Sequence, residues 1–225
     1  MKTAEFLIFL VSLQRKWLLM QDLKTISTYK ASLRERILET AMEAFSEKGI
    51  RAVRMDDIAQ QLSISKRTLY ELYENKEILL FEGVQKYKRT REQQMSELVR
   101  NSENVMDLML NIYRSKVEEF KKTSPLFYSD IEKYPSVVAL FDADSSQSRE
   151  RFCDFLRRGM REGFFRSDID MELVPSMFDT IMKLIMEQQL YLRFSIEELF
   201  RNLVFVAFRG ICTRRGSDIL DTFLI

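Results

Sequence analysis

A short run of basic, hydroxyl and aromatic side chains offers the clearest chemistry in this sequence. The run consists of Ser65, Lys66, Arg67, Thr68 and Tyr70. Lysine and arginine donate hydrogen bonds to guanine acceptors and to phosphates, whereas threonine and tyrosine suit phosphates and thymine methyl groups. These residue types at this spacing therefore predict a surface that contacts DNA.

The surrounding window, residues 55–73, has the pattern of a helix-turn-helix. A short helix is expected over 55–62, and Ser65 can cap a second helix that runs to about residue 73. Ala59 is small enough to let the two helices cross closely. The second helix then presents its N-terminal residues to base edges in the major groove. The apolar residues that fix it against the first helix are Ile58, Leu62, Ile64, Leu69 and Leu72.

Further cations flank this window and add phosphate contacts, which supply much of the affinity for DNA. They are Arg51, Arg54 and Lys76. The net charge of the chain is only +1, so any DNA-binding surface must be local. An ordinary helical hairpin with a solvated charged face is the alternative. It is disfavoured because the cap, the small residue, the apolar spacing and the basic cluster all agree.

Composition predicts a folded, all-α chain. Of the 225 residues, 46% are hydrophobic and 31% are charged, which excludes a disordered chain. Only 6 Gly and 3 Pro occur, too few for many short strands. Periodic apolar residues predict a helix over 32–48 that Gly49 ends, and Asn75 can cap the long helix that follows. Later helices are expected over 75–100, 105–122, 125–134, 136–165, 171–193 and 195–213.

The N-terminus carries an apolar segment at residues 6–13. It is too short to cross a bilayer, which takes about 20 apolar residues, and no A-x-A cleavage site follows it. A start codon assigned too early is the preferred interpretation, because Met20 lies just upstream of the first predicted domain. A genuine extra amphipathic helix is the alternative. We therefore expect no membrane association.

The sequence does not favour an enzyme. It has no His, no Gly-rich phosphate loop and no nucleophile motif. Cys153 and Cys212 lack metal-ligand spacing and are interpreted as reduced thiols, although a disulfide is left open. No catalytic residue, metal site or cofactor is predicted. An enzyme built on a helical bundle, and a helical interaction module or membrane-associated protein, are the competing classes.

The segment RERILETAMEAFSEKGIRAVRMDDIAQQLSISKRTLYELYENKEILL resembles the N-terminal DNA-binding domain of the TetR/AcrR family of bacterial regulators. The resemblance is strong over about residues 32–81. It implies a cytoplasmic homodimer that binds double-stranded operator DNA, as a repressor released by a small effector; an activator is left open. It also implies a helix-turn-helix domain over 30–78 and a helical effector-binding and dimerisation domain over 79–225, after an extension at 1–29.

Position by position, the resemblance extends to the site residues. Lys66, Arg67, Thr68 and Tyr70 resemble the DNA-facing residues of the family, and Lys76 resembles its phosphate clamp at a helix N-terminus. The sequence departs from the family at several positions. Arg54 replaces a capping Thr or Ser, Ser63 replaces a turn Gly, and Leu72 replaces a polar His or Tyr, while Glu71 either accepts from cytosine or repels phosphate.

The later helices are rich in Met and Phe. Such residues usually fill a core, but they also line pockets for apolar ligands. We expect a small apolar or aromatic effector, with Tyr113, Tyr128, Lys183 and Gln189 as possible polar anchors. The resemblance implies that the helices over 171–193 and 195–213 form a four-helix dimer interface, with burial inside the monomer as the alternative. The candidate pocket residues are Met109, Tyr113, Phe127, Phe155, Phe178 and Met182.

Overall fold

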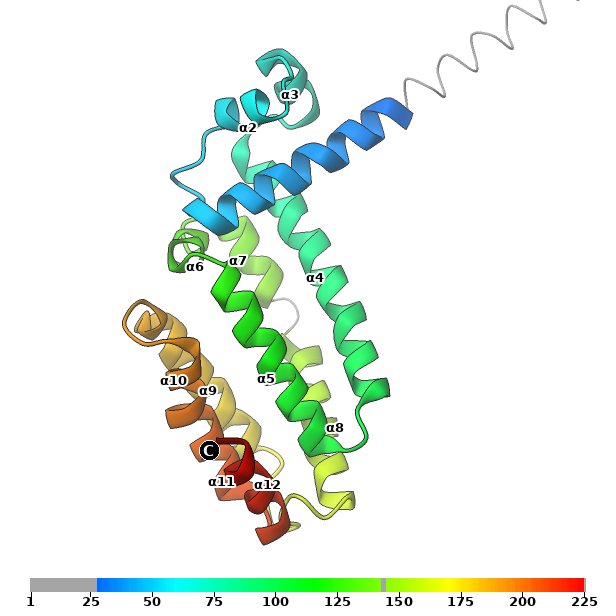
Figure 1. Cartoon of the computed structure of the whole chain (residues 1–225), viewed down its shortest axis with the longest axis vertical. Helices are drawn as coiled ribbons and strands as arrows, with labels where there is room; N and C mark the ends of the chain where they lie inside the picture. The colour runs from blue at the N-terminus through cyan, green and yellow to red at the C-terminus, as the bar shows by residue number, and fades with distance from the viewer. Residues whose placement is uncertain (1–27, 143–144, 225) are drawn as a thin grey trace, which may run out of the picture.

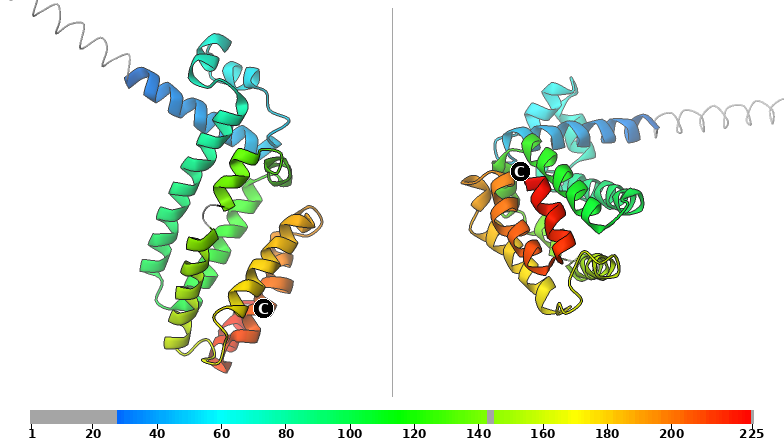
Figure 2. Two further views of the ribbon diagram at one scale, coloured as in Figure 1. Left: turned by 180° about the vertical axis from the view of Figure 1, so that it is seen from behind. Right: turned by 60° about the horizontal axis from the view of Figure 1, so that its bottom comes forward.

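The computed structural model describes residues 28–142 and 145–224 (Figure 1). The predicted N-terminal extension at 1–29 therefore lies almost wholly outside the described residues. The first described helix spans residues 28–48. It crosses the upper part of a long helix, α4, beside two short helices at one end of the molecule (Figures 1 and 2).

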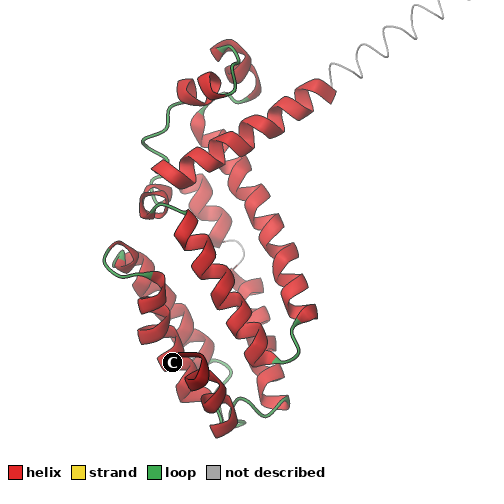
Figure 3. Cartoon of the chain, viewed as in Figure 1, coloured by secondary structure: helices red, strands yellow, loops and turns green. Residues whose placement is uncertain are grey.

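The described residues are helical or in loops (Figure 3), apart from one isolated bridge between Phe165 and Cys212. The predicted all-α fold, with an N-terminal helix-turn-helix and a C-terminal helical bundle, is confirmed. After the first helix the elements are α2 (Met55–Gln61), α3 (Lys66–Leu72), α4 (Lys76–Asn101), α5 (Val105–Lys122), α6 (Pro125–Ile131), α7 (Pro135–Asp142), α8 (Ser145–Arg161), α9 (Leu173–Glu187), the 3₁₀ turn η1 (Leu190–Leu192), α10 (Ile196–Leu199), the π turn η2 (Phe200–Val204), α11 (Phe205–Ile211) and α12 (Arg214–Leu224).

The first helix, α2, α3 and the start of α4 share one hydrophobic core. Burial of these apolar side chains from water holds the four helices together. Val137 of α7 joins the same core, so this N-terminal head (residues 28–84) is packed against the body formed by the later helices. The largest fully buried side chains of this core are Phe45, Tyr73, Ile37, Ile50, Ile58, Leu69, Leu79 and Leu80.

The loop after the first helix is tied to α6. Gly49 has φ +84°, and a Cβ there would lie 2.9 Å from the Cβ of Leu126, so both the conformation and the contact require glycine. The Arg51 backbone N–H donates to Asp130 Oδ2 at 2.8 Å. The division of the chain into 30–78 and 79–225 stays a prediction, and these contacts cross it.

The largest differences between the predicted helices and the structure concern three of them. The expected helix over 136–165 is instead α7 and α8, which end and begin at Asp142 and Ser145. The helix expected over 171–193 ends at Glu187, because Gln189 takes a left-handed conformation with φ 49°. The helix expected over 195–213 begins at the predicted cap, Ser195, but widens into the π turn η2.

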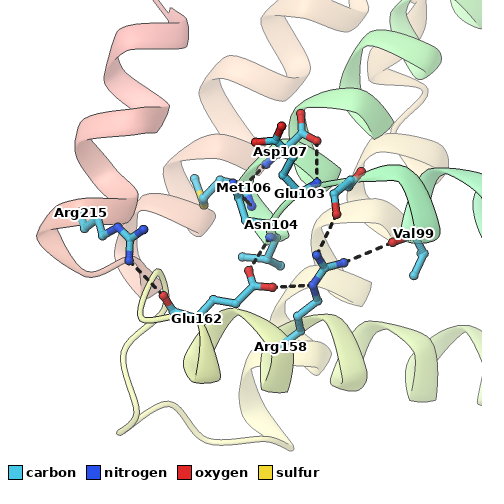
Figure 4. A network of polar contacts seen from close by, with 10 residues as sticks. Val99, Glu103, Asn104, Met106, Asp107, Arg158, Glu162 and Arg215 are labelled. Atoms are coloured by element: carbon cyan, nitrogen blue, oxygen red, sulfur yellow. Dashed lines mark hydrogen bonds and ion pairs between the residues drawn. The ribbon is translucent and has the colours of Figure 1, made fainter.

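At the far end from α2 and α3, a polar network joins the α4–α5 turn to α8 (Figure 4). Arg158 pairs with Glu162 at 2.6 Å and donates to the carbonyl oxygen of Ser102 at 3.0 Å. The second oxygen of Glu162 accepts from the Val105 backbone N–H at 2.6 Å. The lower end of α4 is thereby held against α8.

Candidate nucleic-acid interface and ligand cavity

The turn between α2 and α3 brings the two helices into close contact. Ala59 and Leu69 are buried at the crossing, and the Ile64 backbone N–H donates to the Ala59 carbonyl oxygen at 3.0 Å. Ser63 completes the turn with φ 53°, in the left-handed region. The replacement of the usual turn glycine noted in the sequence is therefore tolerated with backbone strain, since only glycine adopts this region freely.

Replacing Ser63 with glycine is expected to raise the free energy of unfolding by about 1 kcal/mol, because it removes the left-handed strain at an exposed position. The greater freedom of glycine in the unfolded chain offsets part of this gain. Urea unfolding of the full chain measures the change. Ser65→Ala, which removes a helix cap two residues away, should destabilise by about 1 kcal/mol and serves as the opposite control. A Ser63→Gly variant less stable than wild type would contradict this account.

The hydroxyl of Ser65 caps α3. Ser65 Oγ accepts from the Thr68 backbone N–H at 3.0 Å and lies 2.8 Å from Thr68 Oγ1. The predicted cap is thus present. In this conformation both hydroxyls orient the first turn of α3.

Three side chains of α3 project into solvent. Lys66 is 67% exposed and Arg67 is 89% exposed, while 47% of Tyr70 is accessible. Lys66 pairs with Asp56 of α2 at 2.6 Å, and Arg67 pairs with Glu71 at 2.8 Å. The hydrogen bond from Lys66 to Asp56 raises the pKa of Lys66. Exposed ion pairs of this kind are weak, and phosphates can displace their carboxylates.

Arg54 occupies the N-cap of α2 without a side-chain cap bond, as its chemistry requires. The missing acceptor is partly compensated by Asp57, whose Oδ2 accepts from the Arg54 backbone N–H at 2.8 Å. The Arg54 side chain is exposed beside α2. It is therefore available to a phosphate.

Lys76 is half-buried and turned inward. Its Nζ donates to the backbone carbonyl oxygens of Ile50 and Val53, at 2.9 Å each. Burial lowers the pKa of Lys76. In this conformation Lys76 fastens the start of α4 to the loop before α2, while Asn75 caps α4 by accepting from the Ile78 N–H at 3.0 Å.

A cavity of about 1670 Å³ lies between α4 and α8, with α5, η2 and α11 among its lining elements. Two of the six predicted pocket residues, Met109 and Phe155, line it. The other four lie elsewhere. Phe178 packs on Phe208 behind the lining, and Tyr113 sits in a cluster with Phe200, Phe205 and Phe223. Phe127 packs against the core of the head, and Met182 is 52% exposed.

A polar corner of this cavity was not found from the sequence. Arg91 of α4 and Lys116 of α5 each lie 3.0 Å from Glu119 Oε2, and Tyr87 donates to the other oxygen of Glu119. Burial opposes ionisation of Glu119, but Lys116, Tyr87 and Arg91 outweigh it and lower its pKa. No sequence signal separates these residues from the many solvated charges on the same helices.

The exposed basic face of α3, mounted on a helix-turn-helix, defines a DNA-binding transcriptional regulator. Residues 37–82 match the model of a protein family described as "Bacterial regulatory proteins, tetR family". Residues 37–82 thus form a DNA-binding domain of the TetR type.

Curated relatives and solved structures agree with this assignment. The chain is 27% identical over 149 residues to the HTH-type transcriptional repressor KstR2 of Mycobacterium tuberculosis, covering 64% of this chain and 74% of that protein. It is 24% identical to the KstR2 of Mycolicibacterium smegmatis, again over 149 residues that cover 64% of this chain and 73% of the relative. A regulator from Saccharomonospora viridis in complex with choline shares the fold with a TM-score of 0.67 and 18% identity, over 82% of this chain and 100% of that one.

Neither cysteine forms a disulfide in the structure, and burial raises the pKa of Cys212 to about 11. Within the described residues, every helix is too short or too polar to cross a bilayer.

Proposed function

We propose that this chain acts in the cytoplasm as a homodimeric repressor, which leaves its operator when a small effector binds the cavity between α4 and α8. The observation that carries the proposal is the connection between two sites. Lys66, Arg67 and Tyr70 are exposed on α3, and α4, which follows directly, also forms one wall of the cavity.

Helix α4 is suited to couple the two sites. Its 26 residues span about 39 Å at 1.5 Å per residue. Leu79 and Leu80 at its start are buried in the head, and Lys76 fastens it to the loop before α2. Residues from Tyr87 to Arg100 line the cavity. If α4 has two orientations, a ligand that binds one of them more tightly shifts the protein toward that orientation. Because the start of α4 is packed into the head, the head would move with it.

An exposed apolar stripe supports a dimer. On α9, Leu173, Met177 and Leu184 recur at steps of four and seven residues and are 69%, 39% and 45% exposed. Val206 of α11 is a further exposed apolar residue, at 63%. Apolar stripes of this kind are usually covered by another helix. Pairing α9 and α11 of two copies would bury the stripe and place two α3 helices for a two-fold symmetric site.

The relatives support a repressor that responds to a ligand. The KstR2 proteins are named transcriptional repressors, and the Saccharomonospora viridis regulator was solved with choline. Choline is a cation, whereas Arg91 and Lys116 lie on the cavity wall of this chain. We therefore transfer the presence of a ligand to this chain, but not its identity.

Selection of bound DNA from a random-sequence library tests the proposal. The full-length protein should enrich a palindrome whose half-sites are centred about 10 base pairs apart, or a multiple of that. Footprinting should then protect both half-sites. Failure to enrich any two-fold symmetric sequence would contradict the proposed function.

A further inference from the structure

We propose that the effector is an amphipathic anion: an apolar body lies along the cavity and a carboxylate or phosphate headgroup binds between Arg91 and Lys116. This assignment rests on the proposed function, because it takes the cavity between α4 and α8 as the effector site. It goes further by naming the chemistry that the cavity selects.

The cavity is large and much of its lining is apolar. Its volume of about 1670 Å³ exceeds the roughly 300–1,000 Å³ of usual ligand pockets. An extended ligand therefore fits better than a small compact one. The apolar surface comes from α5, α8 and the η2–α11 segment, where Met109, Phe155, Val204, Phe205 and Phe208 lie.

The charge around this apolar surface is unbalanced. Eight basic residues line the cavity against three acidic ones, and the carboxylates of Glu119 and Glu162, outside the lining, pair with three of these cations. The chain as a whole carries a net charge of only +1, so the imbalance is local. Charges of one sign along a cleft with low-dielectric walls raise the local concentration of the opposite charge. The cavity therefore favours anions before any contact is made.

One corner supplies the contact. Arg91 and Lys116 line the cavity and both lie 3.0 Å from the same oxygen of Glu119, which itself is not part of the lining. The single negative charge of Glu119 therefore compensates only one of the two positive charges of Arg91 and Lys116. A net charge of +1 is left at this corner of the cavity. Burial lowers the pKa of Lys116, which shows that its charge is costly in this surrounding. A ligand carboxylate or phosphate would accept charge-assisted hydrogen bonds from both cations.

Other ligand classes fit this corner poorly. A cationic amphiphile would place a like charge beside Arg91 and Lys116. A neutral ligand would remove water from both cations and offer at most an uncharged hydrogen-bond acceptor in return, which is weaker than a carboxylate or phosphate. The arrangement selects an anionic head joined to an apolar body.

Three probes with the same apolar chain separate these classes: decanoate, 1-decanol and decyltrimethylammonium. Isothermal titration calorimetry on the full-length wild-type protein should show decanoate binding at least about tenfold more tightly than either of the others, as expected for a gained charge-assisted contact. Equal or tighter binding of the alcohol or the ammonium probe would overturn the assignment. So would the absence of binding by all three.

Two substitutions should change decanoate affinity in opposite directions. Lys116→Met keeps the aliphatic stem but removes the charge, and should weaken binding about tenfold. Glu119→Gln removes the competing carboxylate and should strengthen binding several-fold. Lys121→Met, on the same helix but outside the lining, is the matched control and should leave affinity unchanged. A merely hydrophobic site would respond to none of these charges, and that result would overturn the proposal.

The two proposals fail in distinguishable ways. If DNA selection enriches a palindrome but decyltrimethylammonium binds best, the regulator stands and the anionic effector is wrong. If decanoate binds with the predicted dependence on Lys116 and Glu119 while no DNA is enriched, the cavity chemistry stands and the proposed regulation is wrong. Thermal unfolding of each variant separates altered binding from misfolding.

Discussion

Replacement of both Lys66 and Arg67 by alanine is expected to reduce affinity for the operator by at least about a hundredfold. Each side chain is exposed at the start of α3, where a recognition helix reaches base edges and phosphates. Loss of one good base contact weakens binding by roughly tenfold or more, and two such losses multiply when they are independent. Gel-shift titration with the selected palindrome measures the effect.

The fold should survive this double substitution. Neither side chain belongs to the core of the head, and their ion-pair partners, Asp56 and Glu71, are themselves on the surface. Lys121→Ala with Lys122→Ala removes the same charge from the end of α5 and is the matched control. A double variant at Lys66 and Arg67 that binds the palindrome like the control would sink the recognition-helix assignment.

The helix-turn-helix could be predicted from the sequence because its signals are local. Caps at Ser65 and Asn75 act within three residues. The helix expected over 55–62 and the helix capped by Ser65 and expected to reach about residue 73 each end one residue earlier, as α2 and α3. The exposure of Lys66, Arg67 and Tyr70 could also be predicted from the helical period. Leu69 is on the buried face of α3, so these three residues lie on other faces of the helix. Short-range capping and periodicity fix such a motif before any distant contact is known.

The contacts that Lys76 makes in the structure could not be predicted from local sequence signals. By position it resembles a phosphate clamp, yet its Nζ donates to the carbonyl oxygens of Ile50 and Val53. That contact depends on the path of a loop more than twenty residues earlier, which no periodic pattern encodes. A contact between Lys76 and a DNA phosphate stays a prediction.

The residues that line the cavity were even harder to predict from the sequence. Periodicity identifies the apolar face of a helix but not the neighbour that covers it. Met109 and Phe155 face the cavity, whereas Phe127 packs on the head and Met182 meets solvent. The dimer interface over 171–193 and 195–213 stays a prediction, and within these segments Ile185, Val204 and Phe208 are buried in the monomer. The exposed stripe is formed by their helical neighbours instead.

Substitution of Leu184 by glutamate is expected to dissociate the dimer. Leu184 lies on the exposed stripe of α9, and each dimer carries two copies. Because each Leu184 is 45% exposed in the monomer, loss of the two leucines removes about 2 kcal/mol, which weakens association about thirtyfold, and the buried carboxylates add to this effect. Sedimentation analysis of the full-length protein should show monomers where the wild type is dimeric. Operator affinity should fall with it, because one head then binds one half-site alone.

Met182→Glu is the matched control for this experiment. Met182 is on the same helix, is 52% exposed against 45% for Leu184, and lies about 200° around the helix from it. The substitution therefore introduces the same charge into the same element, on a face outside the stripe. It should leave the protein dimeric. Equal dissociation by both substitutions would point to unfolding of α9, and a dimeric Leu184→Glu protein would place the interface on another surface.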